Sequence, residues 1–408
     1  MSAAGFRELI ERLSSDPAVA GISLKGHYES LTGRTVTPPA GTIRQDGEPV
    51  GVFASADGEP AATLDTWGSV ASRCEALLAG TYGDRALADI LGFPLVTLVD
   101  DDGNVLTTSV ELSHRQADAT WRLCRDELRE AGVAFDDIQQ ATRSHPDALL
   151  TGFPTAIPFG WWHSHTKRSQ AAVDEAAKGK RGVKAGADAD LAQVKDTYLG
   201  HYVMNPAESR SARLFTAEFI ALGVVERRRM AAKVDALFAA VKADQKVAGQ
   251  KLSTLGLGSI PPTRISREAD PKRPTPSDLT YRAIESHAFL SFTGLRTFRF
   301  EETTTARALV TALTLLLYLL LHQNLAFRAG TELRLIEPGL EVAVERHGVS
   351  SEALELPTVA DLIDLVRELG AEVGWNGPRV VTVSASSPLG RVIGLIDGKV
   401  ELEHEEDH

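Results

Sequence analysis

The longest apolar run in the sequence, residues 308–321, constrains the fold more than any other feature. Thr311 and Thr314 interrupt this run, and the polar residues 322–324 end it. The run is too short to cross a lipid bilayer comfortably. Because 43% of the residues are hydrophobic, the chain can bury a substantial core. The pattern therefore predicts a buried helix over residues 305–322.

The 408 residues suggest one large elaborated domain or two smaller ones. Helix-like and strand-like segments alternate without the regular spacing of βαβ units. This favours an α+β fold with a sheet, helices on one face and long insertions. An RRM or ferredoxin-like core fits the pattern, although periodicity alone does not select it. Helices are predicted at residues 6–14, 67–79, 114–131 and 226–250, and strands at 21–31, 95–99, 295–300 and 331–336.

The net charge of −12 argues at first against a nucleic-acid partner. The distribution of charge changes that interpretation. Residues 161–300 hold 23 Lys and Arg against 14 Asp and Glu, a net of +9, and the rest of the chain carries −21. A phosphate backbone could be bound by this basic block. Helical insertions can also be basic merely to stay solvated, so both interpretations remain open.

Aromatic and basic residues share this middle segment. Stacking on aromatic rings combined with Lys and Arg contacts is the chemistry of single-strand binding. The aromatic residues are Trp161, Trp162, Tyr198, Tyr202 and Phe215, and the basic ones include Arg227, Arg228, Arg229, Lys233, Lys242, Lys246 and Lys251.

A Trp-Trp-His-Ser-His motif offers a competing, enzymatic hypothesis. His163 and His165, two residues apart on a strand, face the same side and could hold a metal. The motif resembles the metal-binding segment of JAB/MPN-type metalloproteases. The positions where that family has Ser and Asp hold Val173 and Ala176 here, and nothing in the sequence places His201 nearby as a third ligand. A zinc-dependent hydrolase centred on His163 and His165 therefore stays the alternative.

Other signs of catalysis are weak. The glycine-rich string at 255–259 lacks the Lys-Ser/Thr of a P-loop, and no Gly-x-Ser-x-Gly elbow is present. Cys74 and Cys124 fall on apolar helical faces and are predicted to be core residues. Two cysteines in so long a chain, with no evident signal peptide, favour the reducing cytoplasm. We expect no cofactor and no membrane partner.

Five segments in order resemble the Cas-seven backbone family, specifically the RAMP-type subunit of type I-G (formerly I-U) CRISPR complexes. They are Ser-Val-Ala-Ser-Arg-Cys-Glu at 69–75, Leu-Thr-Thr-Ser-Val-Glu-Leu-Ser-His-Arg at 106–115, Phe-Pro-Thr-Ala-Ile-Pro-Phe-Gly-Trp-Trp at 153–162, Ala-Arg-Leu-Phe-Thr-Ala-Glu at 212–218, and the Leu-Gly loop at 252–262. His163 stands where that family has an acidic residue, and 166–209 resembles an insertion.

The resemblance implies a modified RRM/ferredoxin-like core, the palm, with long inserted elements. That core would span residues 1–356, with insertions at about 32–63 and 166–280, and residues 357–408 would form a C-terminal α/β extension with an acidic tail. It implies a CRISPR RNA-binding, non-enzymatic subunit of a Cascade-like effector in antiviral defence. The expected partners are CRISPR RNA, target DNA through guide pairing, other copies of the chain and other CRISPR effector subunits.

The resemblance also implies where the guide RNA lies. Ser69 and Arg73 share one helical turn, and His114 and Arg115 precede the next predicted helix. Arginines and lysines around the 166–209 insertion would neutralise phosphates, since the Arg fork binds phosphate bidentately. The base-displacing hairpin is predicted at 32–63, with 166–209 as the alternative. The predicted RNA-binding set is Ser69, Arg73, His114, Arg115, Trp162, His163, Lys167, Arg168, Arg210 and Arg213.

Overall fold

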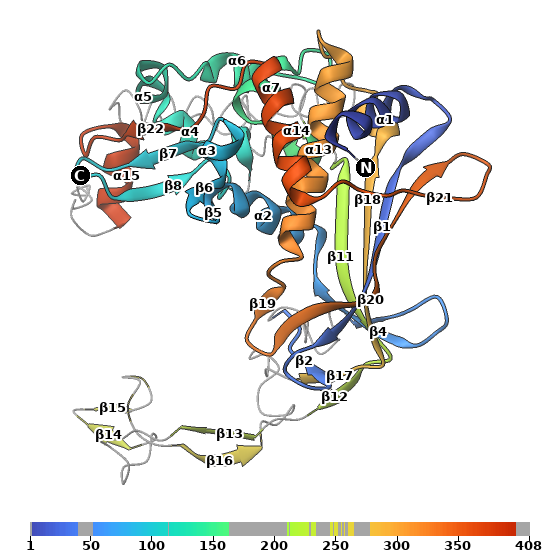
Figure 1. Ribbon diagram of the computed structural model, residues 1–408. Coiled ribbons are helices and arrows are strands. Elements are labelled where there is room, and N and C mark those ends of the chain that lie inside the picture. The colour runs from blue at the N-terminus through green and yellow to red at the C-terminus, as the bar shows by residue number, and fades with distance from the viewer. Residues whose placement is uncertain are drawn as a thin grey trace, which may run out of the picture.

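The computed structural model describes residues 2–39, 52–112, 114–162, 213–227 and 278–396, with shorter pieces at 210–211, 230–233, 245–247, 249–251, 254, 257 and 260–264. The fold is mixed α+β, as predicted, with a long antiparallel sheet as its spine (Figure 1). The strand order is β19-β20-β1-β18-β11-β4-β3, and β21 also pairs with β20. The bounds are β1 Val19–Ser30, β3 Val52–Ala54, β4 Pro60–Asp65, β11 Phe215–Leu222, β18 Ala283–Ser291, β19 Ala326–Arg328, β20 Thr331–Arg346 and β21 Glu352–Ala353.

The central strand β1 lies between β18 and β20 and is antiparallel to both. Its burial alternates, because successive side chains of a strand point to opposite faces. Ile22, Leu24 and Tyr28 are buried on the face that carries the helices, while Lys25 and His27 lie on the other face. This alternation explains why the strand could be predicted over residues 21–31.

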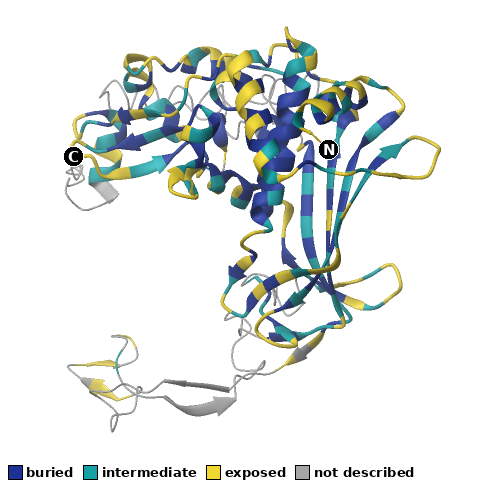
Figure 2. Cartoon of the chain, viewed as in Figure 1, coloured by how far each residue is buried: buried dark blue, intermediate teal, exposed yellow. Residues whose placement is uncertain are grey.

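Helices cover one face of the sheet at one end of the molecule. They are α1 Ala3–Ser15, α2 Trp67–Ala76, α13 Thr303–Leu321 and α14 Val359–Glu372. Helix α13 packs against α1, α2 and α14, and buried residues gather around it in Figure 2. Within the described residues it is the one helix long and apolar enough to cross a membrane, but 78% of that window is buried inside the fold. It is therefore a core helix, as predicted for residues 305–322.

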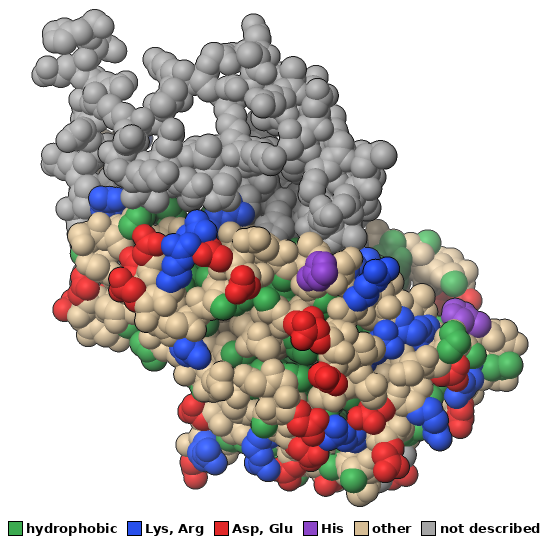
Figure 3. All heavy atoms as spheres, turned by 90° about the horizontal axis from the view of Figure 1, so that it is seen from above, with side chains coloured by type: hydrophobic (Ala, Val, Ile, Leu, Met, Phe, Trp, Pro, Cys, Tyr) green, Lys and Arg blue, Asp and Glu red, His purple; other side chains and the backbone are tan. Residues whose placement is uncertain are grey.

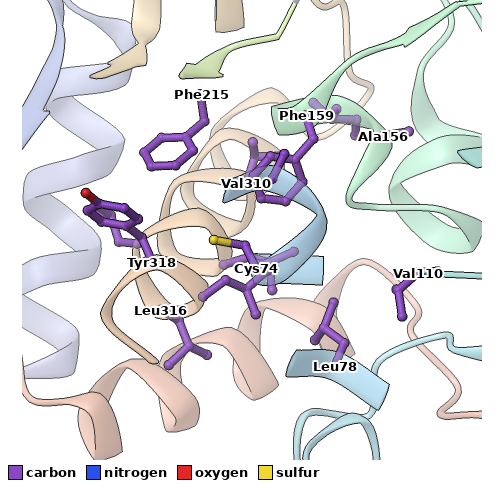
Figure 4. Packing of buried hydrophobic residues seen from close by; sticks show 14 of the residues in the cluster. Cys74, Leu78, Val110, Ala156, Phe159, Phe215, Val310, Leu316 and Tyr318 are labelled. Atoms are coloured by element: carbon purple, nitrogen blue, oxygen red, sulfur yellow. The ribbon is translucent and has the colours of Figure 1, made fainter. Parts of the chain in front are cut away.

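The core joins α2, α13 and the sheet through aromatic contacts (Figure 4). Phe215 of β11 packs edge-on against Tyr318 of α13, with ring centroids 5.2 Å apart. Phe159, from the short helix α8 (Ala156–Phe159), lies on the other side of Phe215. Cys74 is fully buried beside α13, and burial raises the pKa of its thiol. Cys74 and Cys124 are thus both core residues, which confirms their predicted role.

A second, smaller sheet lies beside the helices, with the order β22-β7-β8. Strand β22 (Arg379–Thr382) pairs in parallel with β7 (Val96–Val99), which pairs antiparallel with β8 (Val105–Thr108). The predicted domain boundary at 356/357 stays a prediction, but the segment after it shares this sheet with residues 96–108. The short helices around it are α3 Leu87–Leu91, α4 Ala119–Leu123, α5 Arg125–Glu130, α6 Phe135–Gln140, α7 Asp147–Gly152 and α15 Pro388–Ile396.

Between β11 and β18 the chain forms an arm at the end of the spine remote from α13 (Figure 1). Strands β12 (Val225–Arg227) and β17 (Asp278–Thr280) pair at its base, together with β2 (Thr35–Val36). Farther out, β13 (Met230–Lys233) pairs with β16 (Ile260–Arg264), and β14 (Lys246–Val247) pairs with β15 (Gln250–Lys251). We call residues 225–280 the arm.

Three secondary-structure predictions were wrong. The described residues of 226–250 form strands instead of a basic helix. β12 and β13 pair with segments about 30 residues or more away, which local periodicity does not register, and β14 pairs with the neighbouring β15. Residues 114–131 form a 3₁₀ turn, α4 and α5 rather than one helix, since Arg115 has a φ of 52° and Asp118 caps a new helix. Residues 296–300 form no strand, because the N–H groups of Thr297 and Phe298 donate to carbonyl oxygens in a turn that follows the short helix α12 (Phe292–Leu295).

Candidate nucleic-acid interface

Helix α2 presents a polar face away from the core. Thr66 caps its first turn by accepting a hydrogen bond from the backbone N–H of Ser69 at 3.3 Å. Val70 and Cys74 point into the core, and Ser69 and Arg73, one helical turn apart, share the adjacent, partly exposed face. This confirms the predicted helical relation of Ser69 and Arg73.

Arg73 belongs to a cluster centred on the buried carboxylate of Asp65, at the end of β4. The Nε of Arg73 donates to Asp65 Oδ2 at 3.0 Å, and its Nη2 donates to the carbonyl oxygen of Phe327 at 2.8 Å. Its guanidinium also lies 4.9 Å from the centre of the Phe327 ring. A second cation, Arg328, approaches the other oxygen of Asp65 at 3.6 Å. Two arginines therefore share one carboxylate.

Arg115 is held in a second cluster beneath α2. Its guanidinium binds Glu75 bidentately, with Nε–Oε1 and Nη2–Oε2 distances of 2.8 and 2.7 Å, and its Nη1 donates to the carbonyl oxygen of Gly160. Arg115 is 5% exposed and Glu75 is 3% exposed. Burial raises the pKa of Glu75, whereas Arg115, Thr155 and Arg213 lower it. Arg115 thus connects α2 to the segment around Gly160.

Arg213 lies over the first turn of α2. A methyl group built on Gly68 would meet its Nη2 at 3.5 Å. Desolvation and the positive charge of Arg115 lower the pKa of Arg213, while Glu75 raises it. Arg115 and Arg213 therefore both interact with Glu75, so this second cluster also has two cations for one anion.

The two clusters leave positive charge uncompensated at α2. Each carboxylate, Asp65 and Glu75, balances one of the two arginines around it. By contrast, the part of the surface drawn in colour in Figure 3 intersperses acidic and basic side chains. A polyanion would be attracted to α2 rather than to a broad basic field.

The remaining predicted site residues are only partly described. His114 is exposed next to the buried Arg115. Trp162 and Arg210 are cross-strand partners in a short hairpin of β9 (Trp161–Trp162) and β10 (Arg210–Ser211). His163, Lys167 and Arg168 lie outside the described residues. The structure thus brings Ser69, Arg73, Arg115 and Arg213 to α2.

Sequence reasoning missed three members of the clusters, namely Asp65, Glu75 and Arg328. Glu75 belongs to the Arg-Cys-Glu string at 73–75, so its proximity to Arg73 could be predicted. Its ion pair with Arg115, 40 residues later, could not. Arg328 meets Arg73 from a strand about 250 residues later. No local pattern indicates such a contact.

The zinc hypothesis gains no support. Among the described residues no group of three His, Cys, Asp or Glu side chains could hold a metal ion. His163 and His165, on which the hypothesis depends, lie outside that part of the chain.

Residues 22–180 match the family model described as CRISPR-associated protein GSU0053. The matched segment contains most of β1, all of α2, and Arg115, and it ends before Arg213 and Arg328. No curated protein matches the chain. The similarity supports a CRISPR-associated protein with a role in CRISPR defence.

Proposed function

We propose that the chain is the guide-RNA-binding backbone subunit of a type I-G CRISPR effector, a Cas-seven (RAMP) protein without catalytic activity of its own. It would work in the cytoplasm, assemble with further copies and other effector subunits along the guide, and leave the bases free to pair with target DNA. The observation that carries this proposal is the surplus of arginine over carboxylate in the two clusters at α2.

The topology supports an RRM-like palm. Four central strands in the order β20-β1-β18-β11, all antiparallel, correspond to the fourth, first, third and second strands of a β-α-β-β-α-β unit. Helix α2 lies between β1 and β11 in sequence, and α13 lies between β18 and β20. In this interpretation the other strands and helices are insertions and extensions of the palm.

The electrostatics support single-stranded RNA as the ligand. Phosphate groups carry one charge each, and arginine offers a planar fork that matches them. Arg73 and Arg213 are accessible members of the clusters, whereas Arg115 is buried and would orient Arg213 through Glu75. We therefore assign phosphate contacts to Arg73 and Arg213 and a supporting role to Arg115.

The arm is a further candidate for the base-displacing element, besides 32–63 and 166–209. It projects from the end of the palm, and its described residues include the exposed Arg227, Lys246 and Lys251. In the 32–63 segment the described residues form β2, β3 and β4, which belong to sheets, and 166–209 lies outside the described residues.

The test is binding of a fluorescent single-stranded RNA of guide length to the purified chain, measured by anisotropy at several salt concentrations. Arg73→Gln and Arg213→Gln should each weaken binding, and each should lower the salt slope by about 0.7, because each removes one phosphate-neutralising cation. Arg367→Gln is the matched control, because Arg367 is exposed on α14 and pairs only locally with Asp364. An absence of RNA binding by the unmodified chain, at any salt concentration, would refute the proposal.

A further inference from the structure

The cluster around Asp65 joins three elements that are distant in sequence. Asp65 ends β4, Arg73 lies on α2, and Arg328 ends β19. Asp65 is 1% exposed, whereas the side chains of Arg73 and Arg328 keep 31% and 23% of their surface exposed. The carboxylate is therefore buried beneath two partly accessible guanidinium groups.

Within the part of the chain that the structure describes, the two guanidinium groups keep donors free for a ligand. Each guanidinium has five N–H donors. Arg73 donates to Asp65 and to the Phe327 carbonyl, and Arg328 donates to the Thr37 carbonyl at 3.2 Å and faces Asp65. These contacts use fewer than half of the ten donors. These contacts also hold the side chains of Arg73 and Arg328 in place, so little conformational entropy is lost when a ligand binds.

The charge balance selects an anion. One carboxylate cannot neutralise two arginines, and the positive charge of each arginine disfavours the charged form of the other. Burial lowers the pKa of Arg328, Asp65 opposes this effect, and the neighbouring Arg73 adds to the lowering. A dianionic or monoanionic group placed between the two forks would complete the balance and accept the free donors.

We infer that Arg73 and Arg328 form a binding site for one phosphate group of a single-stranded RNA, with Asp65 orienting both arginines. The inference rests on the proposed function and deepens it, because it adds Arg328, a residue outside the matched family segment, to the RNA contacts. It also distinguishes Asp65, a positioning residue, from the two arginines that would touch the phosphate.

Two substitutions have opposite expected effects on RNA binding. Arg328→Gln removes one fork, so affinity should fall about tenfold and the salt slope by about 0.7. Asp65→Asn keeps an oxygen that can accept from Arg73 but removes the negative charge that competes with the phosphate, so affinity at low salt should rise severalfold. If the ion cluster has only a structural role, both substitutions should weaken RNA binding or leave it unaltered. That result would overturn the inference.

Two further measurements keep the test decisive if Asp65→Asn does not fold, as checked by circular dichroism. Arg328→Lys keeps the charge but loses the fork, so it should give an affinity between those of the wild type and Arg328→Gln. Single-stranded DNA of the same sequence should show the same loss with Arg328→Gln, since both nucleic acids carry phosphates. A loss confined to RNA would overturn the phosphate assignment in favour of a 2′-hydroxyl contact.

Inorganic phosphate is the third probe. Millimolar phosphate should compete with RNA for the wild-type protein and compete less with Arg328→Gln. If the wild type binds RNA while Arg328→Gln binds equally well, the Arg73–Arg328 site is refuted and the proposed function stands. If the wild type binds no RNA, the proposed function itself is refuted.

Discussion

In the ion pair between Glu75 and Arg115 both charged groups are almost fully buried. Removal of either side chain therefore leaves the other as an unpaired charge in an apolar environment. Breaking such a pair leaves an uncompensated buried charge, which costs about 3–5 kcal/mol. We therefore expect Arg115→Met to lower the free energy of unfolding by that amount in urea titrations. Arg282→Met, which removes an exposed partner of Glu59, should change it by less than about 1 kcal/mol.

A loss of stability below about 1 kcal/mol in Arg115→Met, accompanied by a strong loss of RNA binding, would contradict this structural role. It would instead make Arg115 a direct RNA ligand, as the sequence predicted.

His322 makes the stability of the core depend on pH. Its Nδ1 lies 2.7 Å from the Tyr318 carbonyl oxygen and its Nε2 lies 2.8 Å from the hydroxyl of Tyr28, so the ring donates to the carbonyl and accepts from Tyr28. Burial lowers the pKa of His322 below its usual value, and the Tyr318 carbonyl opposes this. The unfolded chain then binds more protons, so this contribution is full above about pH 6.5 and is lost as pH falls through the folded pKa.

Urea unfolding at pH 7.5 and pH 5.5 tests this expectation. The wild type should lose stability at the lower pH, by at most about 1.4 kcal/mol per pH unit from this group. His322→Gln should lose less between the two pH values, even though it is less stable at both. An equal loss in the two proteins would assign the pH dependence to other groups.

Residue-level prediction from the sequence succeeded where the relation was local. The spacing of Ser69 and Arg73 placed both on one face of α2, and the apolar neighbours of Cys74 placed it in the core. The environment of Arg115 could not be predicted, because its partners Glu75 and Gly160 lie 40 and 45 residues away. The resemblance implied that Arg115 lines the RNA path, and the structure holds its guanidinium in a buried ion pair with Glu75.

At the scale of elements, α14 illustrates a helix whose start is specified by its own sequence. Thr358 accepts a hydrogen bond from the N–H of Asp361 at 3.2 Å, and Asp361 accepts from the N–H of Thr358 at 3.3 Å. Thr358→Ala should lower the free energy of unfolding by about 1 kcal/mol, since the N–H of Asp361 loses its acceptor and the Asp361 carboxylate loses the hydroxyl donor. Thr358→Ser keeps the hydroxyl and should restore most of the loss in the same urea titration.

Predicting elements depended on the distance to their partners. The helices α2 and α13 carry their pattern within a few turns, so both were predicted close to their observed bounds. The arm does not, because β13 pairs with β16 across roughly 30 residues. Its basic residues fitted a helical pattern equally well, and the strand pairings of β12 with β17 and of β13 with β16 distinguish the alternatives.

At the scale of the whole molecule, the sequence predicted the α+β class and a sheet with helices on one face. It could not predict the strand order, because both neighbours of β1 come from the second half of the chain. The difference in net charge between residues 161–300 and the rest of the chain was also only partly informative about the candidate site. It indicated the basic middle segment, but three of the arginines gathered at α2, namely Arg73, Arg115 and Arg328, come from outside that segment.

The arm should be dispensable for folding. Arg227 and Asp278 face each other in β12 and β17, so a short Gly-Ser turn can replace residues 228–277. Among the described residues of this stretch none belongs to the hydrophobic core. We expect the shortened chain to unfold at the same urea concentration as the wild type, while guide-length RNA binds less tightly. A large drop in the unfolding midpoint would mean that the arm packs on the palm.

The central position of β1 has a consequence for how the protein is made. This strand leaves the ribosome early, yet β18 and β20, which flank it, are synthesised more than 250 and about 300 residues later. At a usual elongation rate, roughly 15–60 s pass before both edges of β1 can be paired. During translation the nascent chain therefore carries an apolar strand with two open edges, a state that favours aggregation. Heterologous production should therefore improve with co-expressed chaperones that bind such exposed segments.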